Sequence, residues 1–125
     1  MMRNRYLLAF TLLLAGCSLA TKVPPVANAG PDATIPIGQP MLLDGSLSYD
    51  PDGGRIVRYD WQIVGTPEGR EERRGEMLVE GNQEPVWTSP WIAREEDLGQ
   101  WIFRLQATDD EGDIATDDVV VTIIQ

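Results

Sequence analysis

The sequence of 125 residues contains no histidine and only one cysteine. Without histidine, the chain lacks the commonest general base and the commonest zinc ligand. One cysteine cannot form an internal disulfide, and the chain has no cluster of cysteine and histidine to bind a metal. Carboxylates are plentiful, but nothing singles out a pair for glycoside hydrolysis, and the Asp-rich segments have the composition of turns. We therefore predict a protein that is not an enzyme.

Basic residues are scarce as well, with 10 Lys and Arg against 20 Asp and Glu and a net charge of −10. Arg3 and Arg5 precede the cleavage site predicted below, and their removal would leave a net charge of −12. A domain this acidic repels phosphate backbones, and it has no basic patch to hold anionic lipid. We therefore predict no nucleic-acid partner.

No hydrophobic run is long enough to span a bilayer as a helix, which takes about 20 residues. The longest run, Tyr6–Leu14, follows a short basic segment, as in a secretory signal peptide. It ends at Leu14-Ala15-Gly16-Cys17, which resembles a bacterial lipobox. The resemblance implies that Cys17 is modified with diacylglycerol and becomes the acylated N-terminus after cleavage. The alternative is an ordinary signal peptide with a chance cysteine.

The lipobox implies three segments: residues 1–16 as a lipoprotein signal peptide, 17–25 as the lipidated cysteine with a short tether, and 26–125 as the domain. Pro24-Pro25 favours extended backbone, so the tether is a semi-rigid spacer that holds the domain close to the membrane. We expect a lipid-anchored protein of the cell envelope. In a Gram-negative bacterium, Ser18 after the cysteine implies the outer membrane.

Alternating apolar and polar residues separated by turn motifs predict an all-β domain. Residues 50–54, Asp-Pro-Asp-Gly-Gly, form a turn, and the strand over 55–64 that follows has one buried face that includes Trp61. Further strands are expected at residues 31–37, 40–44, 77–79, 84–92, 100–108, and in two parts at 114–116 and 119–124. We expect these residues to face inward: Ala33, Ile35, Ile37, Met41, Leu43, Trp101, Phe103, Leu105 and Ala107. In the last strand we favour Val119, Val121 and Ile123, or the opposite set if a bulge intervenes.

Several of these motifs occur together in the order typical of one family. They are residues 24–32 (PPVANAGPD), residues 43–53 (LDGSLSYDPDG), Tyr59-Asp60-Trp61, and residues 107–112 (ATDDEG). In this respect the chain resembles a PKD domain, an immunoglobulin-like module common on extracellular and cell-envelope proteins. The resemblance implies an immunoglobulin-like antiparallel β-sandwich of about seven strands. It implies little about function, because such folds carry many different roles.

The resemblance also suggests a structural calcium site, since some PKD domains bind calcium through their loops and the preceding linker. The candidate ligands here are Asp50, Asp52, Asp109 and Asp110. Many PKD domains carry an asparagine just before the Pro-Pro entry, where this chain has Val23, and the loops lack EF-hand spacing. The alternative is that these acids are solvated turn residues.

Two further segments could form a binding surface. The long loop over residues 65–75 is expected to be functional or loosely ordered, and its charge cluster is either a solvated tip or a binding element. Two tryptophans four residues apart share one face of an extended segment, where they either pack on the core or form an aromatic platform for a sugar or peptide. The candidate binding residues are Arg70, Arg73, Arg74, Trp87 and Trp91.

The most economical hypothesis is a non-catalytic envelope lipoprotein that presents a PKD-like module for protein–protein interaction or assembly of an envelope complex. The alternative is a module that binds carbohydrate or another surface polymer, or that mediates adhesion. The tryptophans discriminate between the two, because a polymer-binding platform needs an exposed aromatic ring. No cofactor is implied other than the candidate calcium ion.

Overall fold

The computed structural model describes residues 23–125. The predicted lipobox, including Leu14, Ala15, Gly16 and Cys17, lies outside the described residues. Within residues 23–125 there is no helix with the length and hydropathy to cross a bilayer. The strands are β1 (Ala33–Pro36), β2 (Pro40–Asp44), β3 (Ile56–Gly65), β4 (Met77–Asn82), β5 (Val86–Ile92), β6 (Gly99–Asp109) and β7 (Ile114–Ile124). Two short 3₁₀ helices, η2 (Glu71–Arg73) and η3 (Glu95–Asp97), precede β4 and β6.

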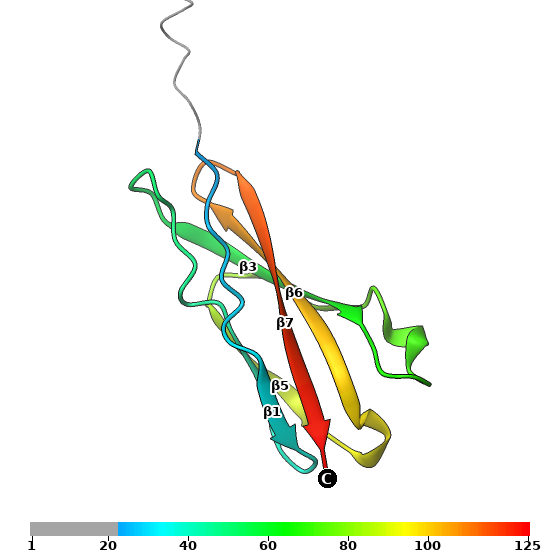
Figure 1. Ribbon diagram of the computed structural model, residues 1–125. Helices are drawn as coiled ribbons and strands as arrows, with labels where there is room; N and C mark the ends of the chain where they lie inside the picture. The colour runs from blue at the N-terminus through cyan, green and yellow to red at the C-terminus, as the bar shows by residue number, and fades with distance from the viewer. Residues whose placement is uncertain (1–22) are drawn as a thin grey trace, which may run out of the picture.

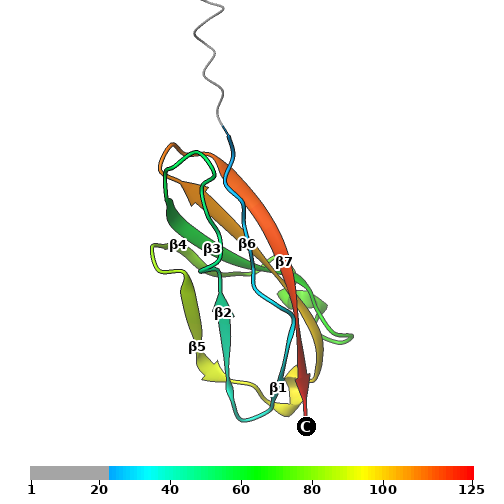
Figure 2. The same cartoon turned by 60° about the vertical axis from the view of Figure 1, so that its left-hand side comes forward.

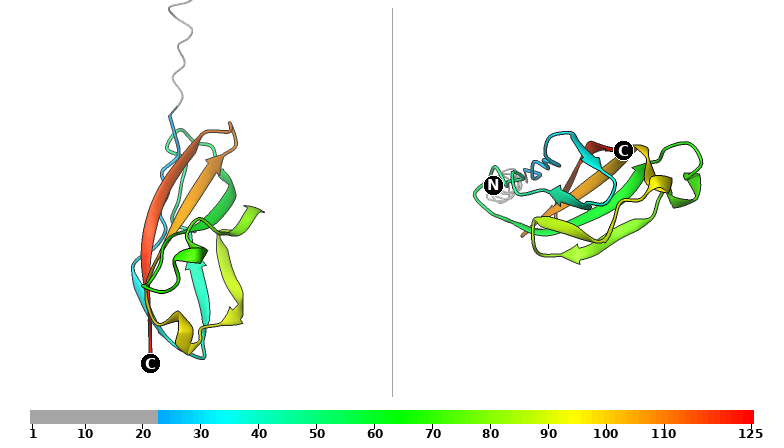
Figure 3. Two further views of the ribbon diagram at one scale, coloured as in Figure 1. Left: turned by 90° about the vertical axis from the view of Figure 1, so that its right-hand side faces the viewer. Right: turned by 90° about the horizontal axis from the view of Figure 1, so that it is seen from below.

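The seven strands form an all-β sandwich of the immunoglobulin type, as predicted (Figures 1 and 2). The larger sheet has the order β1-β7-β6-β3-β4, and the smaller sheet consists of β2 and β5. Seen along its length, the domain has two layers (Figure 3). One pairing departs from the antiparallel prediction, because β1 runs parallel to β7. The two strands lie far apart in the sequence, so no tight turn forces them to be antiparallel.

The strand boundaries follow the sequence pattern closely. β2 has the predicted bounds, β4 is longer than predicted, and β7 is one continuous strand instead of two parts. Pro36 lies in β1 at the edge of the larger sheet, as its missing N–H requires. The prediction that Ala33 faces inward is wrong: it is exposed, because the edge strand covers the core only with Ile35 and the following Ile37.

The core lies between the sheets and is centred on Trp61, whose exposed fraction is 0%. Trp101 stacks beside Phe103, with ring centroids 6.3 Å apart and ring planes within 7°. The residues of β2 and β6 that were predicted to face inward are all buried. In β7, the favoured alternative is the one observed, with Val119, Val121 and Ile123 facing inward. The buried residues are Met41, Leu43, Trp101, Phe103, Leu105, Ala107, Val119, Val121 and Ile123.

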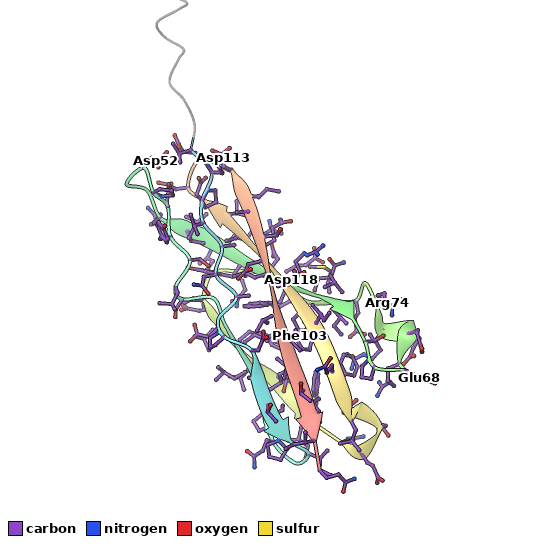
Figure 4. All side chains as sticks on the ribbon, in the orientation of Figure 1. Asp52, Glu68, Arg74, Phe103, Asp113 and Asp118 are labelled. Atoms are coloured by element: carbon purple, nitrogen blue, oxygen red, sulfur yellow. The ribbon has the colours of Figure 1, made fainter. Side chains whose placement is uncertain are left out.

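The loops gather at two places that matter for function. The β2–β3 and β6–β7 loops lie at the end of the domain where the described chain begins (Figure 1). Figure 4 places Asp52 and Asp113 together at this end, and it places Glu68 and Arg74 on the β3–β4 loop at the side of the sandwich. These two places contain most of the polar residues that the sequence had suggested as ligands.

We predict that Trp61→Ala lowers the free energy of unfolding by about 3–5 kcal/mol, because it leaves a large cavity between the sheets. Trp61→Phe should cost much less, since the buried Nε1 of Trp61 has no hydrogen-bond partner to lose. Urea unfolding followed by circular dichroism measures both, with the partly exposed Trp87→Ala as the control. A Trp61→Ala domain as stable as the Trp87→Ala domain would contradict this account of the core.

Candidate functional site

The four candidate calcium ligands lie in two adjoining turns at the end where the chain begins. Asp50 and Asp109 are 8% and 1% exposed, whereas Asp52 and Asp110 are exposed. Two backbone contacts join the turns: the Asp110 N–H donates to the Arg55 carbonyl at 3.0 Å, and the Arg55 N–H donates to Asp110 Oδ1 at 3.4 Å. The structure therefore brings the four predicted aspartates to one place.

A glycine makes this approach of acidic groups possible. A Cβ atom at Gly54 would stand 2.3 Å from Asp50 Oδ2 and 2.3 Å from Asp110 Oδ1. The two carboxylate oxygens therefore face each other across the position that any other side chain would occupy. The second glycine of the Asp-Pro-Asp-Gly-Gly turn is thus required for close packing of carboxylates, whereas Gly53 serves the turn itself with φ of 93°.

Two further acids belong to this group, and the sequence analysis missed them. Carboxylate oxygens of Asp109, Glu111 and Asp113 all lie within 4.8 Å of one another. Asp109 Oδ1 accepts hydrogen bonds from the N–H groups of Glu111 and Asp113, both at 2.9 Å. The signal was present as the alternating acids in residues 109–113, but this segment was interpreted only as a hairpin turn.

The buried carboxylates have oxygen atoms that no protein group satisfies. Within residues 23–125, Asp50 Oδ2 and Asp109 Oδ2 are buried without a hydrogen-bond partner. The pKa of Asp50 rises to about 6, first through its hydrogen bond with Asp52, then through burial and the negative charges of Asp52 and Asp109. Unsatisfied carboxylate oxygens that converge and repel one another are suitable ligands for a hard cation such as Ca²⁺. The residues present therefore fit the group that the family resemblance implied.

The second place is a stack of arginine and tryptophan side chains, which we call the Arg–Trp ladder: Arg70, Arg73, Trp91 and Trp101. The guanidinium carbon of Arg73 lies 5.7 Å from the Trp91 ring centroid and 5.6 Å from that of Trp101. Arg70 lies over Trp101 as well, also at 5.6 Å. All three distances are within the range of cation–π attraction, so the β3–β4 loop contacts one tryptophan from each sheet.

Carboxylates hold both arginines of the ladder in position. Arg70 Nη1 donates to Asp97 Oδ1 at 2.7 Å, and Arg73 forms two hydrogen bonds with Glu76, at 2.6 and 2.8 Å. These contacts raise the pKa of Arg70 and Arg73, mainly through hydrogen bonds to Glu72 and Glu76 respectively. The hydrogen bond from Arg73 also lowers the pKa of Glu76.

Asp97 connects the ladder to the η3 turn. Its Oδ2 accepts a hydrogen bond from the Arg94 N–H at 2.9 Å, and its carbonyl accepts one from Trp101 Nε1 at 2.8 Å. The β3–β4 loop is therefore fastened to the sandwich, and the prediction that its charge cluster is a solvated tip is wrong for Arg70 and Arg73. It holds for Arg74, which is exposed and has no ion pair within the described part of the chain.

Trp87 and Trp91 share one face of β5, as predicted, and that face points toward the core. Both pack against the buried cluster, and Ser89 between them is 6% exposed. Ser89 Oγ accepts a hydrogen bond from the Met41 N–H at 2.9 Å, which aligns β5 with β2. The core-packing alternative is therefore the one observed, and the exposed aromatic platform is not formed.

Comparison with known proteins agrees with the fold. Residues 29–123 match the family model described as K319L-like, PKD domain. The dyslexia-associated protein KIAA0319 homolog of Mus musculus is 36% identical over 105 residues, which are 83% of this chain and 9% of that protein. The chain thus spans about a tenth of the length of the curated relatives that it matches.

Solved structures show the same architecture. The PKD domain from KIAA 1837 protein superposes with a TM-score of 0.56 and 24% identity, covering 87% of this chain and 92% of that domain. The PKD1 domain of Vibrio anguillarum Epp gives 0.53 and 21%, covering 83% and 98%. At these identities, the likeness shows the fold alone.

We predict that Arg73→Ala destabilises the domain by about 1–2 kcal/mol, because two cation–π contacts and a charged hydrogen-bond pair are lost. It should also make the β3–β4 loop sensitive to endoproteinase Glu-C, which cleaves after the glutamates of that loop. Arg74→Ala is the matched control and should change stability by less than about 0.5 kcal/mol. Equal effects of the two substitutions would show that the ladder does not fasten the loop.

Proposed function

The chain belongs to the K319L-like PKD domain family, and we propose that it is a non-catalytic cell-envelope protein, lipid-anchored at Cys17, which presents this domain to a protein partner. The observation that supports a protein partner over a polysaccharide concerns the tryptophans. Trp61 and Trp101 are buried, and Trp87 and Trp91 pack against the core. All four tryptophan rings are thus engaged within the domain.

Carbohydrate or surface-polymer binding remains the second candidate. A platform built on Trp91 would require this side chain to turn outward, which breaks its contact with Arg73 and opens the Arg–Trp ladder. Protein binding needs no such rearrangement, since the exposed strands and loops are already available. Assembly of an envelope complex is the form of protein binding that suits a small domain held close to a membrane.

The anchor places one end of the domain near the membrane. Five residues lie between Cys17 and Val23, and the stretch from Cys17 to Val23 would span about 20 Å if fully extended. The acidic end lies where the described chain begins, so Asp52 and Asp113 would face the anionic surface of the bilayer (Figure 4). If the envelope is that of a Gram-negative bacterium, Ser18 favours the outer membrane.

We further propose that this end binds a structural calcium ion. Asp50, Asp109, Asp110, Glu111 and Asp113 would hold it through carboxylate oxygens, with Asp52 at the margin. The ion would satisfy the buried oxygens of Asp50 and Asp109, join the two turns, and reduce repulsion between the acidic end and anionic lipid.

The proposed function is tested in cells with the full-length chain. Wild type should incorporate labelled palmitate and fractionate with membranes, whereas Cys17→Ala should do neither and Ser18→Ala should retain both. With photocrosslinking residues introduced over the domain surface, the lipidated protein should give a discrete adduct with another protein. Palmitate labelling of Cys17→Ala would contradict the anchor. Protein adducts from no position, with retention of the domain on envelope polysaccharide, would contradict protein binding.

Calcium should raise the melting temperature of the domain. At a calcium concentration ten times the dissociation constant, binding adds about 1.4 kcal/mol to the free energy of unfolding. For a domain of this size, that raises the melting temperature by roughly 5–10 °C. Asp50→Asn should abolish this increase and should stabilise the metal-free domain, because it removes the repelling charge. Glu68→Gln, in the exposed β3–β4 loop, is the control and should respond like wild type. A melting temperature unchanged between chelator and millimolar calcium would exclude the site.

The metal-free domain should also show a pH dependence of defined sign. The pKa of Asp50 is 3.8 in the unfolded chain and about 6 when folded, so the folded state takes up the proton more readily. The contribution of Asp50 to stability is therefore fully present below about pH 4 and is lost as the pH rises through about 6. Asp50→Asn should remove this loss in melting scans.

A further inference from the structure

The two outer faces of the sandwich differ in chemistry. The outer face of the larger sheet carries charged side chains that pair within the sheet, beside the exposed aliphatic residues Ile102, Ile114 and Ile124. Arg104 bonds to Asp118 at 2.8 and 3.0 Å across β6 and β7, and Arg58 contacts Asp60 at 2.8 Å on β3. The charges of these two pairs are therefore already satisfied within the sheet.

The outer face of the smaller sheet is apolar. Its residues alternate with the buried ones along β2 and β5, and all of them are exposed. We call this surface the β2–β5 face: Pro40, Leu42, Asp44, Val86, Thr88, Pro90 and Ile92. Leu42, Val86 and Ile92 have exposed fractions of 56%, 41% and 50%. Asp44 is the only charged residue among the seven, so the face is a patch of the kind that usually marks an interaction site.

Strand pairing makes the patch continuous. Pro40 lies opposite Ile92, Leu42 opposite Thr88, and Asp44 opposite Val86. Beyond the end of β2, Leu47 and Tyr49 are 66% and 55% exposed. Both residues lie in the β2–β3 connection, which leads toward the end where the described chain begins (Figure 2).

One end of the face borders a hollow large enough for a single side chain. Its volume is about 250 Å³, and it is lined by Trp91 and Ile92 and by the charged residues Arg70, Arg73, Arg94, Glu96 and Asp97. The hollow therefore forms a polar margin at this end of the face.

The charges around this face identify the kind of partner. Asp44 lies on the face and Glu84 precedes β5, and neither forms an ion pair among residues 23–125. The hollow has arginines beside its carboxylates, so the unpaired negative charge lies at the end of the face near Val86. Residues 23–125 contain all 20 acidic residues of the chain but no lysine. A second copy would bring the same negative charges, and anionic lipid would be repelled. A protein surface rimmed by lysine and arginine would be attracted.

We propose that the β2–β5 face binds a protein whose contact surface is apolar and rimmed by lysine and arginine. This inference rests on the proposed function and assigns it a surface and a partner chemistry. Leu42, Val86 and Ile92 supply the buried apolar centre, and the unpaired carboxylates around them supply the charge complementarity that selects the partner.

The test is site-specific photocrosslinking of the full-length, lipidated chain in cells. Benzoylphenylalanine is placed at Leu42, Val86 or Ile92, and at Ile102 and Thr116 on the outer face of the larger sheet as matched controls. Adducts with one protein should form at the first three positions and not at the controls. Mass spectrometry should place the crosslink in a segment of that protein with apolar residues next to lysine or arginine.

Reversing the charge of one residue on the face provides the second part of the test. Asp44→Arg should reduce the Val86 adduct about tenfold or more, because it opposes the basic rim. Asp118→Arg, on the outer face of the larger sheet, should leave the adduct unchanged. Circular dichroism verifies that both variants fold. An Asp44→Arg variant that crosslinks like wild type would overturn the partner chemistry.

Other outcomes separate this inference from the function it rests on. A protein adduct at Ile102 or Thr116 alone would overturn the β2–β5 face but leave protein binding in place. Adducts between two copies of the chain, or with lipid alone, would overturn the proposed partner. Adducts at no position on either face would overturn both the inference and the proposed function.

Discussion

The contact of Arg73 with Trp91 and Trp101 is the interaction on which the placement of the β3–β4 loop and of Trp91 depends. Trp91 belongs to the smaller sheet and Trp101 to the larger one, so a single guanidinium joins the two layers. A sheet of two strands buries little surface by itself, and the domain has no disulfide between its sheets. The Arg–Trp ladder supplements the apolar core on the side where the β3–β4 loop lies (Figure 4). It also holds the Trp91 side chain against the domain.

The Arg–Trp ladder and the acidic end of the sandwich are stabilised in opposite ways. At the ladder, arginines and carboxylates neutralise one another, and Asp97 holds both Arg70 and the chain of η3. At the end where the chain begins, Asp50 and Asp109 are buried beside other acids without a basic partner within the described residues. The first arrangement is complete with protein groups alone. The second becomes favourable when a proton or a cation is added, which is the physical basis for the proposed calcium ion.

The strands and the core could be predicted from the sequence because alternation reports burial directly. β6 is the clearest case, since every apolar residue of the inward set from Trp101 to Ala107 is buried. Features that depend on distant residues could not be predicted. The parallel pairing of β1 with β7 leaves no local pattern, and the ladder joins Arg73 to Trp91 across 17 intervening residues. Glu111 and Asp113 were not recognised as candidate ligands because a metal-binding loop and a solvated turn share the same composition.

Acrylamide quenching of tryptophan fluorescence is the most direct test of the central claim that the tryptophan side chains serve the fold and leave recognition to the strands. All four tryptophans lie in the described domain, so the signal reports on all of them. The account predicts quenching well below that of the unfolded chain and no protection by envelope polysaccharide. Arg73→Ala should increase the quenching. A tryptophan in the native domain that quenches as in the unfolded chain, and that polysaccharide protects, would contradict the account.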